Sequence, residues 1–369
     1  MHSDNDTIML LAAGDMCFSD HPLCRGFGVA AMLARHGVDY PFAHVAPLLA
    51  ETDIAFGNLE TALADLPGAG DAAFCSSPAV VAALARHRFQ VMSVANNHTL
   101  QHGEDVFRET LDHLAAHGVQ PVGLPGDDAY SCRPVIRQCR GQAVAFLAYS
   151  FARENFHPDA RCYARSTPEQ IFADVARVRP EVDHVVVACH WGVELADDPT
   201  PGQVALGRGI IDAGAAVVLG HHPHVWHGVE EYGAGVIFYS LGDFIFDLAW
   251  CRRSRQSGLA KIRLAKGARP RWEIVPTTAN RFHQPVPLTG PDRESFLAHL
   301  ESASRRIAAI VPAGPGEPAS ADFMARMKHR DTANQRAKVV HVLVNLHRLG
   351  LGRFAGIAWR KIRPAPRED

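Results

Sequence analysis

Six short apolar runs constrain the fold of this chain more than any other feature, because each ends within a residue or two of a residue that can bind metal. The runs are IMLLAAGD (Asp15), DIAFGNLE (Asn58, Glu60), FQVMSVANNH (Asn97, His98), HVVVACH (His190), AAVVLGHHPH (His222, His224) and VIFYSLGD (Asp243). Apolar runs of this length, bounded by Gly and polar residues, are typical of buried strands in an α/β sheet. Ligands of such sheets gather outside the carboxyl ends of the strands. We therefore expect these side chains to meet at one rim as a metal centre.

Strands and helices alternate from Ile8 to about Leu248, which predicts an α/β fold with a largely parallel sheet. Two later segments, 259–267 and 271–278, are typical of antiparallel strands that extend a second sheet. A helix is expected from Asp292 to about Ile310, followed by a linker rich in Pro and Gly. The earlier helices are expected at 41–50, 78–88, 103–117, 168–178 and 203–213.

Length and composition favour a cytoplasmic enzyme with a full core. The chain has 369 residues, 47% of them apolar, enough for one large domain or two smaller ones. A net charge of −2 gives no reason to expect a nucleic-acid partner. The eight Cys form no CxxC pair and indicate reduced thiols. The apolar N-terminal stretch is too short for a signal peptide, and no run reaches the ~18 apolar residues of a spanning helix.

The last part of the chain is basic and predicts a separate extension. Residues 326–369 hold eleven Lys or Arg and three acids, a net charge of +8, so the remainder carries about −10. We divide the chain into a domain of residues 1–320 and a basic helical extension of residues 321–369. A terminal helix docked on the acidic body explains this asymmetry, and so does a contact with a membrane surface or a synthase complex.

The donor types favour a transition metal or zinc. Asp15 and Glu60 offer charged oxygens and Asn97 a neutral one, whereas the other expected ligands are the imidazoles of His190, His222 and His224. This mixture suits Mn, Fe or Zn better than Ca. In an extended segment, the H-x-H spacing points the rings of His222 and His224 to one side and turns His221 away. Each residue alone has a structural explanation, such as a helix cap, a turn or a satisfied core histidine, but six such strand ends together favour a metal site.

At this point the motifs GDMCFSD, GNLETAL, ANNHTLQHG, HWGVE, GHHPHV and YSLGDFIFD resemble, in order, those of the CapA family of capsule and poly-γ-glutamate synthesis proteins. The resemblance covers about residues 7–248. It implies a branch of the calcineurin-like metallophosphoesterases, with a four-layer α/β/β/α sandwich and a site for two divalent metal ions (Mn, Fe or Zn) at one sheet rim. The basic extension would follow this core.

The resemblance also assigns roles by position. Asp15 matches the superfamily's first aspartate, Asn58 or Glu60 stands where a bridging aspartate is usual, and Asn97 matches the amide ligand. His98 matches the proton donor to a leaving oxygen, although a ring that merely caps its loop is the structural alternative. The remaining matches are metal ligands at His190, His222 and His224. Residues expected to surround the ligands or contact the substrate are Asn58, Asn96, Trp191, Glu194 and Asp243. Arg153, just after the strand AFLAYS, is expected to bind an anionic substrate, because guanidinium suits carboxylate and phosphate alike.

The chain departs from the pattern at three positions. Cys17 replaces a usual His, and an inert buried thiol explains it better than a zinc ligand. Gln101 replaces a usual Asp, so it cannot give His98 the negative charge that raises basicity. Asp243 replaces a usual Asn and adds a carboxylate. Arg252, Arg253 and Arg255 either bind an anionic substrate or form a solvated charge cluster.

These features predict a metal-dependent, phosphoesterase-like hydrolase associated with capsule or poly-γ-glutamate type polymer biosynthesis. Its partner would be an anionic small molecule or polymer, and His98 would protonate the leaving group. Two other functions fit the same residues: an accessory factor of polymer synthesis or export without turnover, and a tailoring enzyme in a small-molecule pathway.

Overall fold

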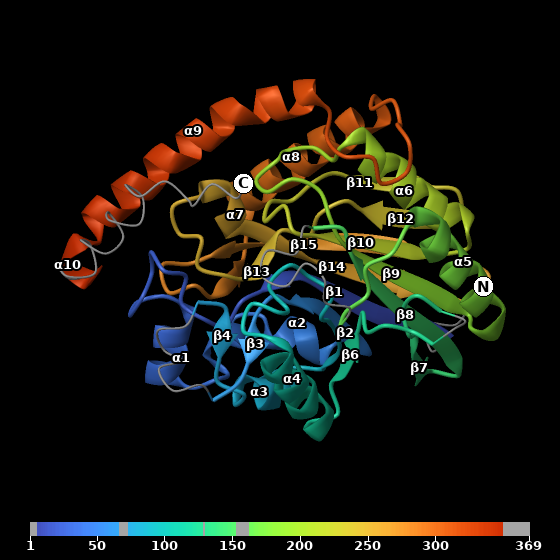
Figure 1. Cartoon of the computed structure of the whole chain (residues 1–369), viewed down its shortest axis with the longest axis horizontal. Helices are drawn as coiled ribbons and strands as arrows, with labels where there is room; N and C mark the ends of the chain where they lie inside the picture. The colour runs from blue at the N-terminus through green and yellow to red at the C-terminus, as the bar shows by residue number, and fades with distance from the viewer. Residues whose placement is uncertain (1–5, 66–72, 128–129, 153–161, 350–369) are drawn as a thin grey trace, which may run out of the picture.

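The computed structural model describes residues 6–65, 73–127, 130–152 and 162–349, and it places two β-sheets face to face between layers of helices (Figure 1). The sheets contact each other through an apolar interior. Phe56 of one sheet stacks on Phe146 of the other, with ring centroids 5.9 Å apart and planes 5° from parallel. The interior between the sheets therefore forms the main core.

The first sheet has eight strands and contains the chain's N-terminal strand. Its order is β16-β15-β14-β1-β2-β5-β6, with β13 paired to β1 off this path. The strands are β1 (Ile8–Met16), β2 (Ile54–Leu59), β5 (Phe89–Ser93), β6 (Gln120–Val122), β13 (Asp243–Ile245), β14 (Gln256–Leu264), β15 (Arg271–Ala279) and β16 (Pro285–Pro287). β14 and β15 are antiparallel, as expected, but β14 pairs with β1 and so extends the first sheet.

The second sheet has six strands in the order β11-β12-β10-β9-β8-β7. They are β7 (Val135–Cys139), β8 (Gln142–Ser150), β9 (His184–His190), β10 (Val217–His221), β11 (Val229–Tyr232) and β12 (Gly235–Phe238). Side chains alternate between its faces: Val186 and Ala188 of β9 point into the space between the sheets, whereas Val185 and Val187 pack toward the outer helices. Because both faces are covered, the strands read as continuous apolar runs.

Helices cover both outer faces, which confirms the expected four-layer α/β/β/α sandwich. Beside the first sheet lie α1 (Val29–His36), α2 (Ala46–Ala50), α3 (Val80–Arg86) and α4 (Glu104–Ala116), and beside the second lie α5 (Pro168–Val178) and α6 (Pro201–Asp212) (Figure 1). The starts of α5 and α6 are encoded locally, because Thr167 with Gln170 and Thr200 with Gln203 form capping boxes. The segment expected as one helix over 41–50 is instead a 3₁₀ turn, Tyr40–Phe42, followed by α2.

Three short elements and two long helices complete the fold. The short ones are a two-stranded sheet of β3 (Ala62–Leu63) and β4 (Cys75–Ser76), and α7 (Arg252–Arg255). α8 (Gly290–Ala308) packs against β11 and β15. α9 (Ala321–Val344), followed by α10 (Leu346–Leu349), runs as a long arm across the molecule (Figure 1). Within the described chain, no helix is both long and apolar enough to cross a membrane.

The parallel registers bring the ends of the central strands to one rim. In the first sheet Asp15 pairs with Asn58 on one side and with Asp243 on the other. In the second sheet His190 pairs with Ser150 and with His221. Polar residues that are far apart in sequence therefore meet where the two sheets face each other.

Candidate metal centre

The rim holds a cluster of buried carboxylate, amide and imidazole groups contributed by both sheets. Asp15, Glu60 and Asn97 come from the first sheet or the loops after its strands, and His190 ends β9 of the second. His222 and His224 follow β10. All of these side chains are buried. The six residues that the sequence nominates as metal ligands thus lie in one cluster.

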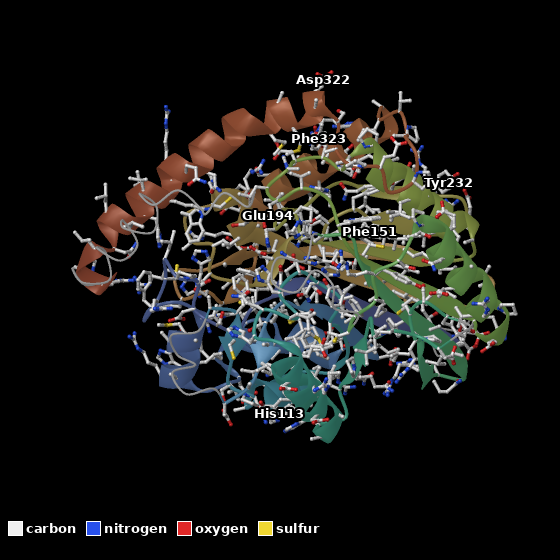
Figure 2. The ribbon with its side chains drawn as sticks, viewed as in Figure 1. His113, Phe151, Glu194, Tyr232, Asp322 and Phe323 are labelled. Atoms are coloured by element: carbon white, nitrogen blue, oxygen red, sulfur yellow. The ribbon has the colours of Figure 1, made fainter. Side chains whose placement is uncertain are left out.

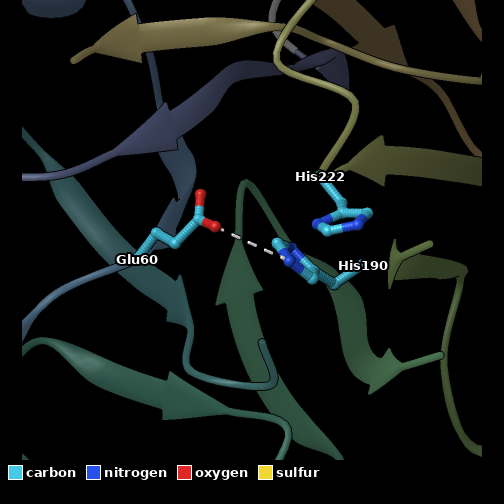
Figure 3. Close-up of side chains that lie close together, drawn as sticks. All are labelled: Glu60, His190 and His222. Atoms are coloured by element: carbon cyan, nitrogen blue, oxygen red, sulfur yellow. Dashed lines mark ion pairs between the residues drawn. The ribbon is translucent and has the colours of Figure 1, made fainter. Parts of the chain in front are cut away.

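Glu60 is the clearest sign that this cluster fits a cation. Its side chain is fully buried, and neither carboxylate oxygen has a hydrogen-bond partner among the described residues. Oε1 lies 3.7 Å from Nε2 of His190 (Figure 3). It also lies 3.8 Å from Nε2 of His98. Burial and the nearby Asp15 carboxylate raise the pKa of Glu60 well above its usual value. An unpaired buried carboxylate is costly, and a metal ion would neutralise it.

His190 and Asn97 add nitrogen and oxygen donors beside Glu60. The Nε2 atom of His190 is 2.8 Å from Oδ1 of Asn97, and its Nδ1 atom is 3.2 Å from Nδ2 of Asn58. Glu60, His190 and His222 each offer an atom within 4.8 Å of the others' atoms (Figure 3). Burial lowers the pKa of His190 well below its usual value, so the ring is neutral. A neutral imidazole is the form that binds metal.

Asp15 joins the two sheets through its hydrogen bonds. Oδ1 accepts from Nδ2 of Asn58 at 2.9 Å and lies 3.1 Å from Nδ1 of His221, while Oδ2 accepts from the backbone N–H of His222 at 3.0 Å. Burial alone raises its pKa, but the contact with His221 and the imidazoles of His224 and His190 hold the pKa of Asp15 well below its usual range. Asp15 is therefore ionised and could bind a cation.

The segment after β10 has a backbone shape that directs two rings into the cluster. His222 and His224 have φ of 94° and 59°, in the left-handed region that non-glycine residues rarely adopt. Nδ1 of His224 is 2.7 Å from Oδ1 of Asp243 and 3.6 Å from Oδ2 of Asp15. Asp15, His224 and Asp243 form a second group with atoms close enough to share a metal ion. Strain at such positions is typical of functional sites.

His98 stands beside Glu60 at the edge of the cluster. Its Nδ1 atom is 2.7 Å from Oε1 of Gln101, and its ring stacks on Phe74 with centroids 3.6 Å apart. Gln101 accepts a hydrogen bond here and so fixes the ring without supplying charge. Burial lowers the pKa of His98 to about 4. The neutral ring that results presents the lone pair of Nε2 to the cluster.

A pocket of about 160 Å³ opens next to these groups. Its floor includes His98, His224 and Glu194, and Glu194 lies in the middle of the molecule near the arm of α9 (Figure 2). His222, His224 and Glu194 form a third group with metal-binding geometry. The rest of the wall is aromatic and apolar, with a polar contribution from α9: Phe74, Phe246, Leu195, Leu248, Trp250, Cys251, His21, Asn334 and Lys338.

The other nominated residues support the cluster. Asn96 donates to the backbone oxygen of Leu59 at 2.9 Å, and its own Oδ1 accepts from the backbone N–H of His98, so it shapes the ligand loop. Asn58 positions Asp15 and His190. The indole of Trp191 donates to the backbone oxygen of Tyr239, away from the pocket.

Arginines and Cys17 are placed differently from the ligands. Arg153 lies outside the described residues. Arg253 pairs with Asp197 and Arg255 donates to the backbone oxygen of Ala279, so both have structural partners. Cys17 is buried, and its Sγ lies 3.2 Å from Oγ of Ser19. Burial raises the pKa of Cys17 far above its usual value, which is typical of an inert thiol.

The expectation that His221 turns away from the cluster is wrong. His221 is the last residue of β10, two residues after Leu219, which faces the interior between the sheets. It pairs with His190 in a parallel register, and paired residues share a face. The segment is not extended beyond this residue, because His222 has a positive φ. The alternation of Val217, Leu219 and His221 along the strand was the signal for this contact.

Comparisons with known proteins show which family the chain resembles. The sequence model of the family described as "Bacterial capsule synthesis protein PGA_cap" matches residues 9–248. The chain is 29% identical to the capsule biosynthesis protein CapA of Bacillus anthracis over 302 residues, covering 78% of this chain and 71% of that one. It is 30% identical to the PGA biosynthesis protein CapA of Bacillus subtilis over 278 residues, covering 70% and 72%.

Among solved structures, a 5'-nucleotidase from Candida albicans aligns with a TM-score of 0.45 and 11% identity. The alignment covers 83% of this chain, which spans 58% of the nucleotidase. The family match extends over most of the sandwich and contains the nominated metal ligands. The chain is therefore a member of the CapA family of bacterial capsule synthesis proteins.

Proposed function

We propose that this protein is a metal-dependent, phosphoesterase-like hydrolase that acts on an anionic substrate in the biosynthesis of a capsule or a poly-γ-glutamate type polymer. The buried Glu60 carboxylate carries the proposal, because its two oxygens have no hydrogen-bond partner in the described part of the chain and it lies beside imidazoles from the opposite sheet. The sequence motifs, which resemble those of metallophosphoesterases, and the names of the relatives support the same class of reaction and the same biological setting.

Two divalent ions, Mn, Fe or Zn, suit the donors best. Glu60, His190 and His222 make one group, Asp15, His224 and Asp243 another, and the two share no residue. Asn97 adds its amide oxygen to the first group, beside His190. A bound divalent ion would polarise a phosphoryl oxygen and make water a stronger nucleophile at neutral pH.

The chain's own residues then hold the substrate and move a proton. The pocket would admit the substrate beside the cluster. His98 contacts the substrate end of the cluster, and Gln101 fixes which of its nitrogens faces inward. An anionic substrate next to His98 favours the protonated ring, which then donates to the leaving oxygen. His98 would thus be the proton donor expected from the sequence. The anionic substrate would allow the buried ring, whose pKa is low, to carry the proton.

Metal analysis and an aryl phosphate assay test this function. Protein purified without added metal should contain Mn, Fe or Zn and hydrolyse 4-nitrophenyl phosphate. His190→Ala and Asn97→Ala should each lose metal and lower kcat/KM at least about a hundredfold, since one ligand typically costs several kcal/mol of transition-state stabilisation. His184→Ala is the matched control, because His184 begins the strand that His190 ends and contacts Gln142. Metal-free wild-type protein, or unchanged turnover in the ligand variants, would reject the proposal.

An accessory role at a membrane is a second candidate, and the outer face of α9 favours it. Val339, Val340, Leu343 and Val344 are all more than half exposed, at 52–67%, and their spacing places them on one side of the helix. The sequence from 326 onward is strongly basic. An apolar stripe next to basic residues suits an anionic lipid surface. The free cysteines fit a reducing compartment, so this surface would be the inner leaflet of the cytoplasmic membrane.

Vesicle co-sedimentation separates this role from hydrolysis. The full chain should pellet with phosphatidylglycerol vesicles more than with phosphatidylcholine vesicles. The double variant Val340→Asp with Leu343→Asp should reduce pelleting severalfold, since it puts charge into the apolar stripe. Val311→Asp is the control, because Val311 is 82% exposed but lies outside α9. Equal pelleting of the double variant and the wild type would show that the outer face of α9 does not bind the vesicles.

A further inference from the structure

The pocket beside the metal centre has a wall that comes from a distant part of the chain. Asn334 and Lys338 of α9 line it together with His98, His224 and Glu194. Both lie outside the segment that matches the family, residues 9–248. The metal-binding motifs therefore do not define the whole pocket.

The inner side of α9 is held against the body, which fixes these two residues in place. His341 lies one turn after Lys338, and its Nε2 is 3.2 Å from the backbone oxygen of Leu23. Val342 is buried and packs in an apolar cluster with Leu23, Phe27 and Trp250. Asn334, Lys338, His341 and Val342 follow the spacing of one helix face. The contacts on this face make α9 a fixed wall.

Lys338 and Asn334 present binding groups to the pocket. The Lys338 ammonium lies 5.6 Å from the centroid of the Trp250 ring. In the part of the chain that the structure describes, no carboxylate lies within 4.0 Å of this ammonium. Oδ1 of Asn334 is buried without a hydrogen-bond partner among the same residues. A cation and an open amide oxygen side by side suit a ligand with a carboxylate next to an N–H or O–H group.

We propose that α9 completes the substrate site, and that Lys338 binds a carboxylate of the substrate while Asn334 accepts a hydrogen bond from a neighbouring group. This inference rests on the proposed hydrolase, in which the reacting group of the same substrate lies at the metal centre. The distribution of charge supports separate places for the reacting group and the carboxylate of the substrate. Glu194 lines the pocket, and the acids Glu60, Asp15 and Asp243 lie in the adjoining cluster, whereas α9 brings the ammonium of Lys338. The site thus selects substrates with two separate anionic groups.

Paired aryl phosphates that differ only in charge test the role of Lys338. We would measure KM and kcat for 3- and 4-carboxyphenyl phosphate and for the neutral carbamoyl counterparts. The wild type should prefer at least one carboxyl probe over its carbamoyl partner. Lys338→Met should raise KM for that probe about tenfold, leave KM for the carbamoyl probe and both kcat values within twofold, and Lys338→Arg should retain the preference. Arg336→Met is the control, because Arg336 is exposed on the same helix and does not line the pocket.

A binding measurement keeps the inference separate from turnover. If the wild type hydrolyses none of the probes, the proposed hydrolase fails, and calorimetric titration of the same probes into metal-loaded protein decides about Lys338. A tenfold loss of affinity in Lys338→Met that is confined to the carboxyl probe supports the inference. The inference is overturned if the wild type shows no preference for charge. It is also overturned if Lys338→Met weakens both probes equally or lowers the unfolding temperature, since Lys338 would then only hold α9 on Trp250.

Discussion

At the scale of single residues, the cluster is explained by the cost of burying charge. A carboxylate without hydrogen bonds in a protein interior costs several kcal/mol, which no ordinary folding requirement recovers. Glu60 is in this position, although Asn96 and Asn58 next to it satisfy their own hydrogen bonds. Because the buried Glu60 carboxylate is costly for folding and lies beside imidazoles, we infer that it binds a metal ion.

Replacing Glu60 by Gln tests this explanation directly. Gln keeps the volume of the Glu60 side chain and removes its charge, so we expect metal affinity to fall about tenfold to a hundredfold. In metal-free protein, the free energy of unfolding should stay the same or rise, because the unpaired buried carboxylate is gone. Metal titration and urea unfolding measure the two effects. Glu51→Gln, at an exposed position, is the control, and a Glu60→Gln protein that binds metal normally would contradict the explanation.

Asp247 is a second buried carboxylate and predicts how stability depends on pH. Burial raises the pKa of Asp247 to about 8, while Oδ2 accepts from the backbone N–H of His21 at 2.9 Å. Oδ1 has no hydrogen-bond partner among the residues that the structure describes. The unfolded chain has a pKa of about 3.9 at this residue. The unfolded state thus loses this proton first as pH rises, and the native state is destabilised between about pH 4 and pH 8.

Asp247→Asn should remove this dependence. At pH 8, the free energy of unfolding of the variant should exceed that of the wild type by at least about 1 kcal/mol. This difference should shrink toward zero at pH 4. Urea unfolding at pH 4, 6 and 8 measures it, with Asp322→Asn at an exposed position as the control. A difference that is the same at all three pH values would show that the carboxylate does not titrate in this window.

At the scale of elements, local patterns predicted the strands and helices but not how they pair. The strand ends carrying Asp15, Asn97 and His190 were predictable, because parallel strands bring polar residues to one rim. The pairing of β14 with β1 was not predictable, because a pattern of alternating apolar residues does not show which strand lies next to it. The sequence does not predict the position of Lys338 at the pocket either. This position depends on the contact of α9 with Leu23, which is more than 300 residues away in the sequence.

Gly14 shows how two strands approach each other to form the site. A Cβ atom there would lie 1.9 Å from the backbone oxygen of Gly242, where β1 passes β13 and Asp15 pairs with Asp243. Gly14→Ala should therefore push the two carboxylates apart, cost about 1–3 kcal/mol of stability and reduce metal content. Thermal unfolding and elemental analysis measure the two effects.

Gly103→Ala is the informative comparison for Gly14→Ala. Gly103 has a φ of 87° but open space around its Cα, so the substitution strains the backbone without a collision. It should cost about 1 kcal/mol and leave metal content unchanged. Equal metal loss in both variants would mean that general destabilisation, and not the spacing of β1 and β13, controls the site.

At the scale of the whole molecule, the donors are divided between the two sheets. Asp15, Glu60, Asn97 and Asp243 belong to the first sheet and its loops, whereas His190, His222 and His224 belong to the second. Contacts such as Asp15 with His221 and Asn97 with His190 also join the two sheets at the rim. A metal bound by both groups would therefore act as a clamp between the sheets, beyond any role in catalysis.

Metal removal should accordingly loosen the rim as well as stop turnover. Metal held at a hundred times its dissociation constant stabilises the folded state by about 2.7 kcal/mol, which raises the unfolding temperature of a chain of this size by about 3–4 °C. Chelation should reverse this shift and speed hydrogen exchange at the carboxyl ends of β9 and β10, while α5 on the outer face exchanges as before. Adding back Mn²⁺ or Zn²⁺ should restore both, because the donors are reassembled by the fold. Loss of turnover without a change in unfolding temperature or in exchange at β9 and β10 would show that the ion is held by one sheet alone.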